Sequence, residues 1–78
     1  MPTVLRVGPY RLFFYSGDAH EPPHVHVARE DGVAKFWLDP VRLAHSRGFR
    51  RAEVRTIGRL VGEHAEELLE AWHDYFAD

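Results

Sequence analysis

The sequence predicts one α+β domain, in which a small antiparallel β-meander of four to five strands precedes one long or two short C-terminal helices packed on one face. Strand-like apolar runs separated by turn residues fill the chain as far as Gly48, and a three- and four-residue hydrophobic period follows from Arg50. With 78 residues, 45% of them hydrophobic, residues 1–78 support a single core. Because that core is small, self-association to a homo-oligomer or a partner would supplement its stability.

The first two strands are predicted from β-favouring residues on either side of a turn. Thr3–Val7 is a short β-favouring run, and Tyr10–Tyr15 is apolar at positions on both faces, as expected of a central strand. Gly8-Pro9 between them predicts a hairpin.

A loop then delivers the chain to a third strand. Ser16–Ala19 has the chemistry of a turn, and Pro22-Pro23 cannot donate to a β-ladder, so His20 and Glu21 are expected in the loop. The run His24–Ala28 alternates histidine with valine, which predicts a half-buried strand. Its valines are expected to point inward and both histidines outward.

Two further strands complete the predicted meander. Val33–Leu38 follows a turn at Glu30–Gly32, and Asp39-Pro40 separates it from a short fifth strand at Val41–His45. A turn at Ser46–Gly48 ends the β-rich part of the chain.

The remainder of the chain is predicted to be helical. Gly62 favours a break, and Glu66 and Glu67 suit the first turn of a second helix that starts near His64; one unbroken helix is the alternative. The apolar residues recur at helical spacing and mark one buried face: Val54, Ile57, Val61, Leu68, Trp72 and Tyr75 or Phe76.

Composition excludes several functional classes. The chain has no cysteine, which removes disulfides, cysteine nucleophiles and cysteine-ligated zinc, so any metal must be held by histidine and carboxylate ligands. The first residues lack the pattern of a signal peptide, and no apolar stretch approaches the roughly 20 residues of a membrane span. We therefore expect a soluble, cytoplasmic protein without a membrane partner.

The net charge of −2 is unevenly distributed. Residues 41–60 contain six arginines and a single acidic residue, Glu53, whereas residues 61–78 contain six acidic residues and no lysine or arginine. The basic block suits phosphate groups, and the acidic block suits solvent or a basic partner. The simpler interpretation is that both blocks are solvated faces of the fold.

The stretch HEPPHVHV, residues 20–27, has three interpretations. His24 and His26 are two residues apart on one strand face, about 6.6 Å between Cα atoms, so they are able to converge on a divalent metal such as zinc with His20 or Glu21. Alternatively, they flank a phosphodiester as general acid and base without any cofactor. The third interpretation is a strand surface with no chemical role.

Aromatic residues near the basic block offer a related hypothesis. Tyr15, Phe36 and Trp37 are able to stack nucleic-acid bases, although aromatic residues of a small meander are more often core. Since Phe36 and Trp37 are adjacent, only one of them points to a given face.

Motifs along the whole chain resemble a known family. The stretches TVLR, FFYS, EPPHVHV, AKFWLDPVRLA, GF and ELLEAWHDYF are similar to those of the bacterial domain-of-unknown-function family 4160. The resemblance implies a small stand-alone protein, often encoded beside a protein of unknown-function family 2442, in a pair interpreted as a toxin–antitoxin module. It therefore implies a small cognate protein partner, and it places the motif at Glu21, Pro22, Pro23, His24 and His26.

Three functional hypotheses follow. The first is the toxin-like or regulatory component of a two-protein module, which cleaves RNA without metal if it is an enzyme. In it His24 and His26 are the catalytic pair, and Glu21, Arg42, Arg47, Arg50 and Arg51 bind the substrate. The second is a non-catalytic protein-binding module that uses the sheet face or the acidic helix. The third is a protein that binds a divalent metal through His20, His24 and His26.

Overall fold

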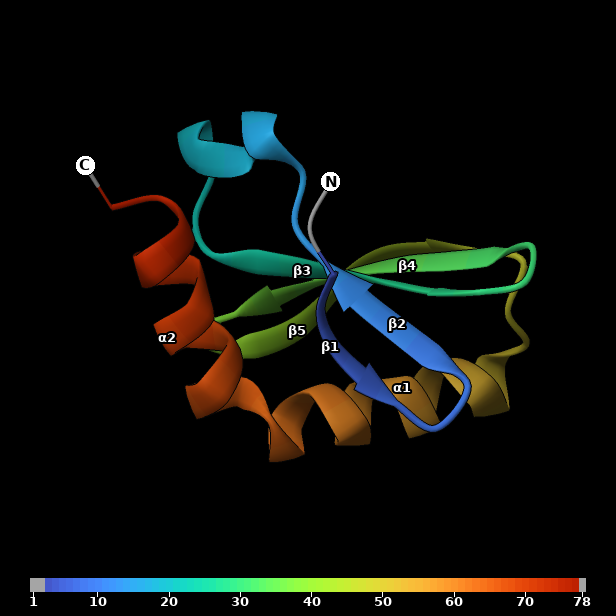
Figure 1. Cartoon of the computed structure of the whole chain (residues 1–78). Coiled ribbons are helices and arrows are strands. Elements are labelled where there is room, and N and C mark those ends of the chain that lie inside the picture. Colours follow the sequence, from blue (N-terminus) through green and yellow to red (C-terminus); the bar gives the residue numbers. More distant parts are fainter. Residues whose placement is uncertain (1–2, 78) are drawn as a thin grey trace.

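A computed structural model describes residues 3–77, and it confirms the predicted α+β class with five strands and two helices. The strands form one antiparallel sheet in the order β1-β2-β3-β4-β5, so each strand pairs with its neighbours in sequence. Figure 1 shows α1 beneath the sheet; α2 then turns away from the direction of α1 and runs along one end of the sheet. The elements are β1 (Thr3–Val7), β2 (Tyr10–Phe13), η1 (Ser16–His20), β3 (His24–Arg29), β4 (Gly32–Leu38), β5 (Val41–Arg47), α1 (Arg51–Glu63) and α2 (Ala65–Tyr75).

The core lies between one sheet face and the two helices. In the central strands, every second residue points to the helices and is almost fully buried. These residues pack against the predicted apolar face of the helices, which contributes Ile57, Val61, Leu68 and Trp72. The ring of Phe36 packs closely against Gly58, where an added Cβ would lie 3.3 Å from the ring. Glycine at this position lets α1 approach the sheet.

The chain forms two helices, which decides between the predicted alternatives. The helix continues through Gly62 and ends at Glu63, and His64 (φ −109°, ψ 13°) leaves the helical conformation. Its backbone amide donates to the carbonyls of Leu60 and Val61, which closes the last turn of α1. Glu66 and Glu67 lie in the first turn of α2, as predicted.

Several boundaries differ from those expected. The second strand ends at Phe13, because the buried Phe14 turns to the helices and stacks edge-on against Trp72 with ring centroids 5.2 Å apart. The predicted loop contains a short 3-10 helix, η1. The fifth strand continues to Arg47, two residues beyond the predicted end, and accommodates an irregularity opposite Lys35 and Phe36.

Two turns depend on backbone conformations that glycine adopts readily. Gly8 has φ +57° in the hairpin between β1 and β2, as the Gly-Pro sequence predicts. Gly48 has φ +83° where the chain leaves β5, and its backbone lies against Gly32. No helix within residues 3–77 is both long and apolar enough to cross a membrane.

Candidate functional site

The two histidines of the HxH motif lie on the sheet face opposite the valines, as predicted, but they are not exposed. Val25 and Val27 belong to the helix-covered core, and His24 and His26 point to the other face. His24 is nevertheless completely buried, and the side chain of His26 is only 13% exposed. The predicted strand face of the two histidines is therefore confirmed, but the expectation that they are exposed there is wrong, because other parts of the chain cover this end of the face.

The cover over the histidines consists of the segment that contains η1 and of aromatic side chains. Figure 1 shows η1 standing over the start of β3. The ring of His24 lies between Trp37 of β4 and Trp72 of α2, with centroid distances of 5.5 and 5.1 Å. The ring of His26 stacks on Phe13 at 5.5 Å and contacts Tyr15 at 4.6 Å. These contacts fix both imidazoles in position.

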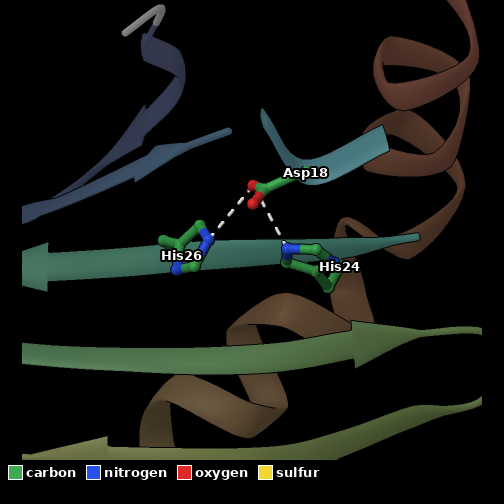
Figure 2. A group of neighbouring side chains, drawn as sticks. All are labelled: Asp18, His24 and His26. Carbon is green, nitrogen blue, oxygen red and sulfur yellow. Dashed lines mark hydrogen bonds and ion pairs between the residues drawn. The ribbon is translucent and has the colours of Figure 1, made fainter. Parts of the chain in front are cut away.

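Asp18 of η1 lies between the two imidazoles (Figure 2). Its Oδ2 is 3.1 Å from Nε2 of His24 and 3.2 Å from Nε2 of His26. The same oxygen accepts a hydrogen bond of 2.9 Å from the backbone amide of Tyr15, which ties the carboxylate to the start of the 3-10 helix. The loop thus aims one carboxylate oxygen at both ring nitrogens.

The two prolines orient the buried histidine. The carbonyl of Pro22 accepts a 2.9 Å hydrogen bond from Nδ1 of His24, and the carbonyl of Pro23 accepts one of 3.0 Å from the Leu38 amide. A carbonyl can only accept, so Nδ1 of His24 carries the proton of the neutral ring. Nε2 of His24 therefore presents either a lone pair or a second proton to Asp18.

This Nε2 atom is the unusual feature of the site. It is completely buried, and its short contact with Asp18 is poorly directed, so within residues 3–77 it has no partner with hydrogen-bond geometry. A lone pair 3.1 Å from an anionic oxygen is repelled, and a buried polar atom without a partner costs about 1–3 kcal/mol. A cation placed between the three groups, either a proton or a metal ion, would remove that cost.

The pKa values at the site reflect burial and mutual attraction. Burial is the largest influence on the pKa of Asp18 and raises it, but the Tyr15 amide and the two imidazoles outweigh it, so this pKa lies below its usual value. Burial is also the main reason that the pKa of His26 lies below its usual value, and it prevails over the attraction of Asp18. Asp18 is thus anionic and His26 neutral at pH 7, the forms in which both bind metals.

The spacing of the donor atoms fits a metal ion. One ligand atom each from Asp18, His24 and His26 lies within 4.8 Å of the other two. At typical zinc–ligand distances, neighbouring ligands of a tetrahedral ion are about 3.3 Å apart, close to both nitrogen–oxygen separations given above. Two histidines and one carboxylate form a donor set that suits zinc and iron(II), and they leave a coordination position open.

Glu21 and Lys35 form an ion pair beside this site. Glu21 Oε1 accepts from Lys35 Nζ, and this hydrogen bond is the main reason that the pKa of Glu21 is lowered. The same carboxylate oxygen is 3.9 Å from Nδ1 of His24, and Lys35 Nζ lies 4.7 Å from the ring centroid of Trp37. Glu21 is therefore near the histidines, as predicted, but it neutralises a lysine and does not point at the Nε2 atoms.

The other predicted site residues are dispersed. His20, a predicted metal ligand, is exposed at the end of η1 and is not part of the cluster. Arg42 and Arg47 lie on β5, whereas Arg50 precedes α1 and Arg51 begins it; all four are exposed. The sequence reasoning missed Asp18, which it treated only as a turn residue. One signal in the sequence pointed to Asp18 as a site residue. This carboxylate lies six residues before the His-x-His pair, and two prolines stiffen the chain between them.

These features define a small α+β domain in which a five-stranded meander and η1 bring two histidines and an aspartate together at one end of the sheet face opposite the helices. The chain belongs to the family described as domain of unknown function (DUF4160), whose model matches residues 10–73, and this confirms the resemblance seen in the sequence. The matched region includes all three cluster residues. Searches of the curated proteins and of the solved structures gave no match.

Proposed function

We propose that this protein binds a divalent transition metal, zinc foremost, through Asp18, His24 and His26. The observation that carries the proposal is the buried Nε2 of His24, which has no hydrogen-bond partner within residues 3–77 and faces a carboxylate that also contacts His26. Such an arrangement is costly when empty and favourable around a cation. The outer contacts agree with this use, since the Nδ1 hydrogen bond to Pro22 leaves Nε2 as the ligand atom.

The same burial bears on the hypothesis of metal-independent RNA cleavage. Acid–base catalysis by His24 and His26 requires both rings to reach one phosphodiester. His24 has no exposed surface, whereas a metal ion or a proton is small enough to reach its Nε2 atom. We therefore favour metal binding. The ribonuclease activity and the two-protein module remain predictions from the sequence.

Three protein ligands leave one position of a tetrahedral metal for water or for a ligand from another molecule. When bound, zinc would lower the pKa of a coordinated water and supply a nucleophile at neutral pH. The residues of this chain would hold the metal and limit the access of solvent. Tyr15, whose ring contacts His26, is 45% exposed, and His26 and Asp18 keep side-chain exposures of 13% and 15%, so a ligand would approach from the side of these residues.

The test is a titration of untagged, metal-free protein with Zn²⁺ by calorimetry, repeated with Co²⁺ to read the coordination geometry from its visible spectrum. We expect one ion per chain and a tetrahedral Co²⁺ spectrum. Loss of one ligand should weaken binding at least about ten-fold in Asp18→Asn and in His26→Gln. His45→Gln is the matched control, because His45 is an exposed histidine on the same sheet face. No binding by the wild type, or equal binding by Asp18→Asn and the control, would exclude the site.

A further inference from the structure

The sheet face opposite the helices carries a row of side chains that spans all five strands, and three of the five are arginines. Residues paired across neighbouring antiparallel strands point to the same side. The pairs Arg6–Arg11, Arg11–Ala28, Ala28–Val33 and Val33–Arg47 therefore place five side chains in one line across this face. Arginines occupy both ends of the line, and two short apolar side chains occupy its middle.

Two further lines of paired residues run parallel to the first. The second contains Phe13, His26, Lys35 and His45, and the third contains His24, Trp37 and Arg42. We call the three lines together the open face. Its strand residues include five lysines or arginines and no acidic residue: Arg6, Arg11, Lys35, Arg42 and Arg47.

Most of this positive charge is not neutralised. Lys35 pairs with Glu21, but within residues 3–77 no carboxylate lies within ion-pair distance of Arg6, Arg11, Arg42 or Arg47. The carboxylates of Asp18 and Glu21, beside the histidines of the open face, are engaged with residues already described. The net charge of −2 therefore conceals a basic surface, because most acidic residues lie on the helices and turns.

The open face also offers aromatic rings and a flat apolar strip. Tyr15 is 45% exposed at one end of the face, and Trp37 is half-buried in its third line. Ala28 and Val33 form the strip between Arg11 and Arg47, whose strands are about 14 Å apart. Arginines that bind phosphates, together with rings that stack on bases, are the two components of single-strand recognition.

From this arrangement we infer that the open face binds single-stranded nucleic acid, with the backbone crossing the strands from β1 to β5. Arg6, Arg11 and Arg47 contact phosphates, and Tyr15 stacks on a base at the end near η1. A single strand fits better than a duplex, because a duplex is read by an element that enters a groove and this face presents only the surface of a sheet. The inference does not require a metal in the Asp18 cluster.

The test is fluorescence anisotropy with a labelled 12-nucleotide single strand of mixed sequence, as RNA and as DNA, in 50 mM salt with EDTA. The first variant is Arg6→Gln with Arg47→Gln, which removes exposed charges from the two ends of the row. The matched control is Arg55→Gln with Arg59→Gln, which removes the same charge from exposed positions of α1. All proteins are compared by circular dichroism.

We expect the sheet variant to bind either oligonucleotide roughly ten-fold more weakly and the helix variant less than three-fold. The slope of log K against log salt should become shallower by about 1.4 in the sheet variant, since each lost phosphate contact contributes about 0.7. Tyr15→Ala should weaken binding roughly five-fold or more. Comparison of the RNA and DNA arms identifies the preferred sugar.

Four outcomes would overturn the inference. Equal losses in the sheet and helix variants would mean that only net charge matters, and unchanged affinity in Tyr15→Ala would remove base stacking. Tighter binding of the matching duplex would contradict a single-strand surface. Polyglutamate that binds as tightly as the oligonucleotide would identify an acidic protein as the better partner. Because EDTA is present throughout, failure here leaves the metal proposal standing, and failure of metal binding leaves this inference standing.

Discussion

A methyl group added at Gly32 should destabilise the protein, because Phe49 covers this residue. A Cβ built on Gly32 would lie 2.5, 2.7 and 2.8 Å from Cε1, Cζ and Cδ1 of Phe49, well inside contact distance. The Phe49 ring is not free to move away, since it packs against the core and lies edge-on to the Tyr10 ring with centroids 6.5 Å apart. Overpacking of this kind costs about 1–3 kcal/mol, against which alanine recovers roughly 0.5–1 kcal/mol of backbone entropy.

We therefore expect Gly32→Ala to lower the free energy of unfolding by about 1–2 kcal/mol and Tm by roughly 5–15 °C. Urea unfolding measures the loss, and the double variant with Phe49→Ala should be no less stable than Phe49→Ala alone, because the clash is then absent. Gly62→Ala is the matched control, since nothing lies near its added Cβ and alanine favours the helix by about 1 kcal/mol. A Gly32→Ala protein as stable as the wild type would refute the packing argument.

Three other results are expected. Zinc at a free concentration of one hundred times the wild-type Kd should raise the free energy of unfolding by about 2.7 kcal/mol and Tm by roughly 10 °C or more in a thermal melt. Asp18→Asn, with at least ten-fold weaker binding, should gain no more than about 1.4 kcal/mol at the same zinc concentration. Burial, and then the 2.8 Å hydrogen bond to Glu53, raise the pKa of Tyr10 in the folded protein. The contribution of the protonated Tyr10 hydroxyl to the free energy of unfolding is therefore complete below about pH 10, and it is lost as the pH rises through the folded-state pKa. Urea midpoints between pH 8 and 12 should consequently fall less steeply in Tyr10→Phe than in the wild type. Leu68→Ala, at a fully buried core position, should cost about 2–5 kcal/mol in the same unfolding assay.

The fold was largely predictable because its signals are local. Alternation of apolar residues, the Gly8-Pro9 turn and the helical spacing from Val54 to Trp72 each depend on neighbours within a few positions. The errors arose where distant packing decides. The second strand ends at Phe13 and not at the predicted Tyr15, and Phe14 packs against Trp72, 58 positions away in the chain.

The site was predictable only in part, for a related reason. The alternation of His24–Val27 fixed which strand face carries the histidines, and the structure agrees. Strand alternation carries no information on what covers that face. The burial of His24 comes from η1, from Trp37 and from Trp72, which approach from three separate parts of the chain. Asp18 was missed because its role depends on the path of the loop.

The layer structure explains why both proposed sites lie on the same side of the molecule. The two helices pack against one sheet face, and most side chains of that face belong to the core. On the other face η1 and Trp72 of α2 cover one end, where Asp18 meets the histidines. The rest of the face stays open, and the charged side chains at its strand positions are all basic. The proposed metal centre therefore lies at the covered end of this face, and the proposed nucleic-acid surface lies beside it.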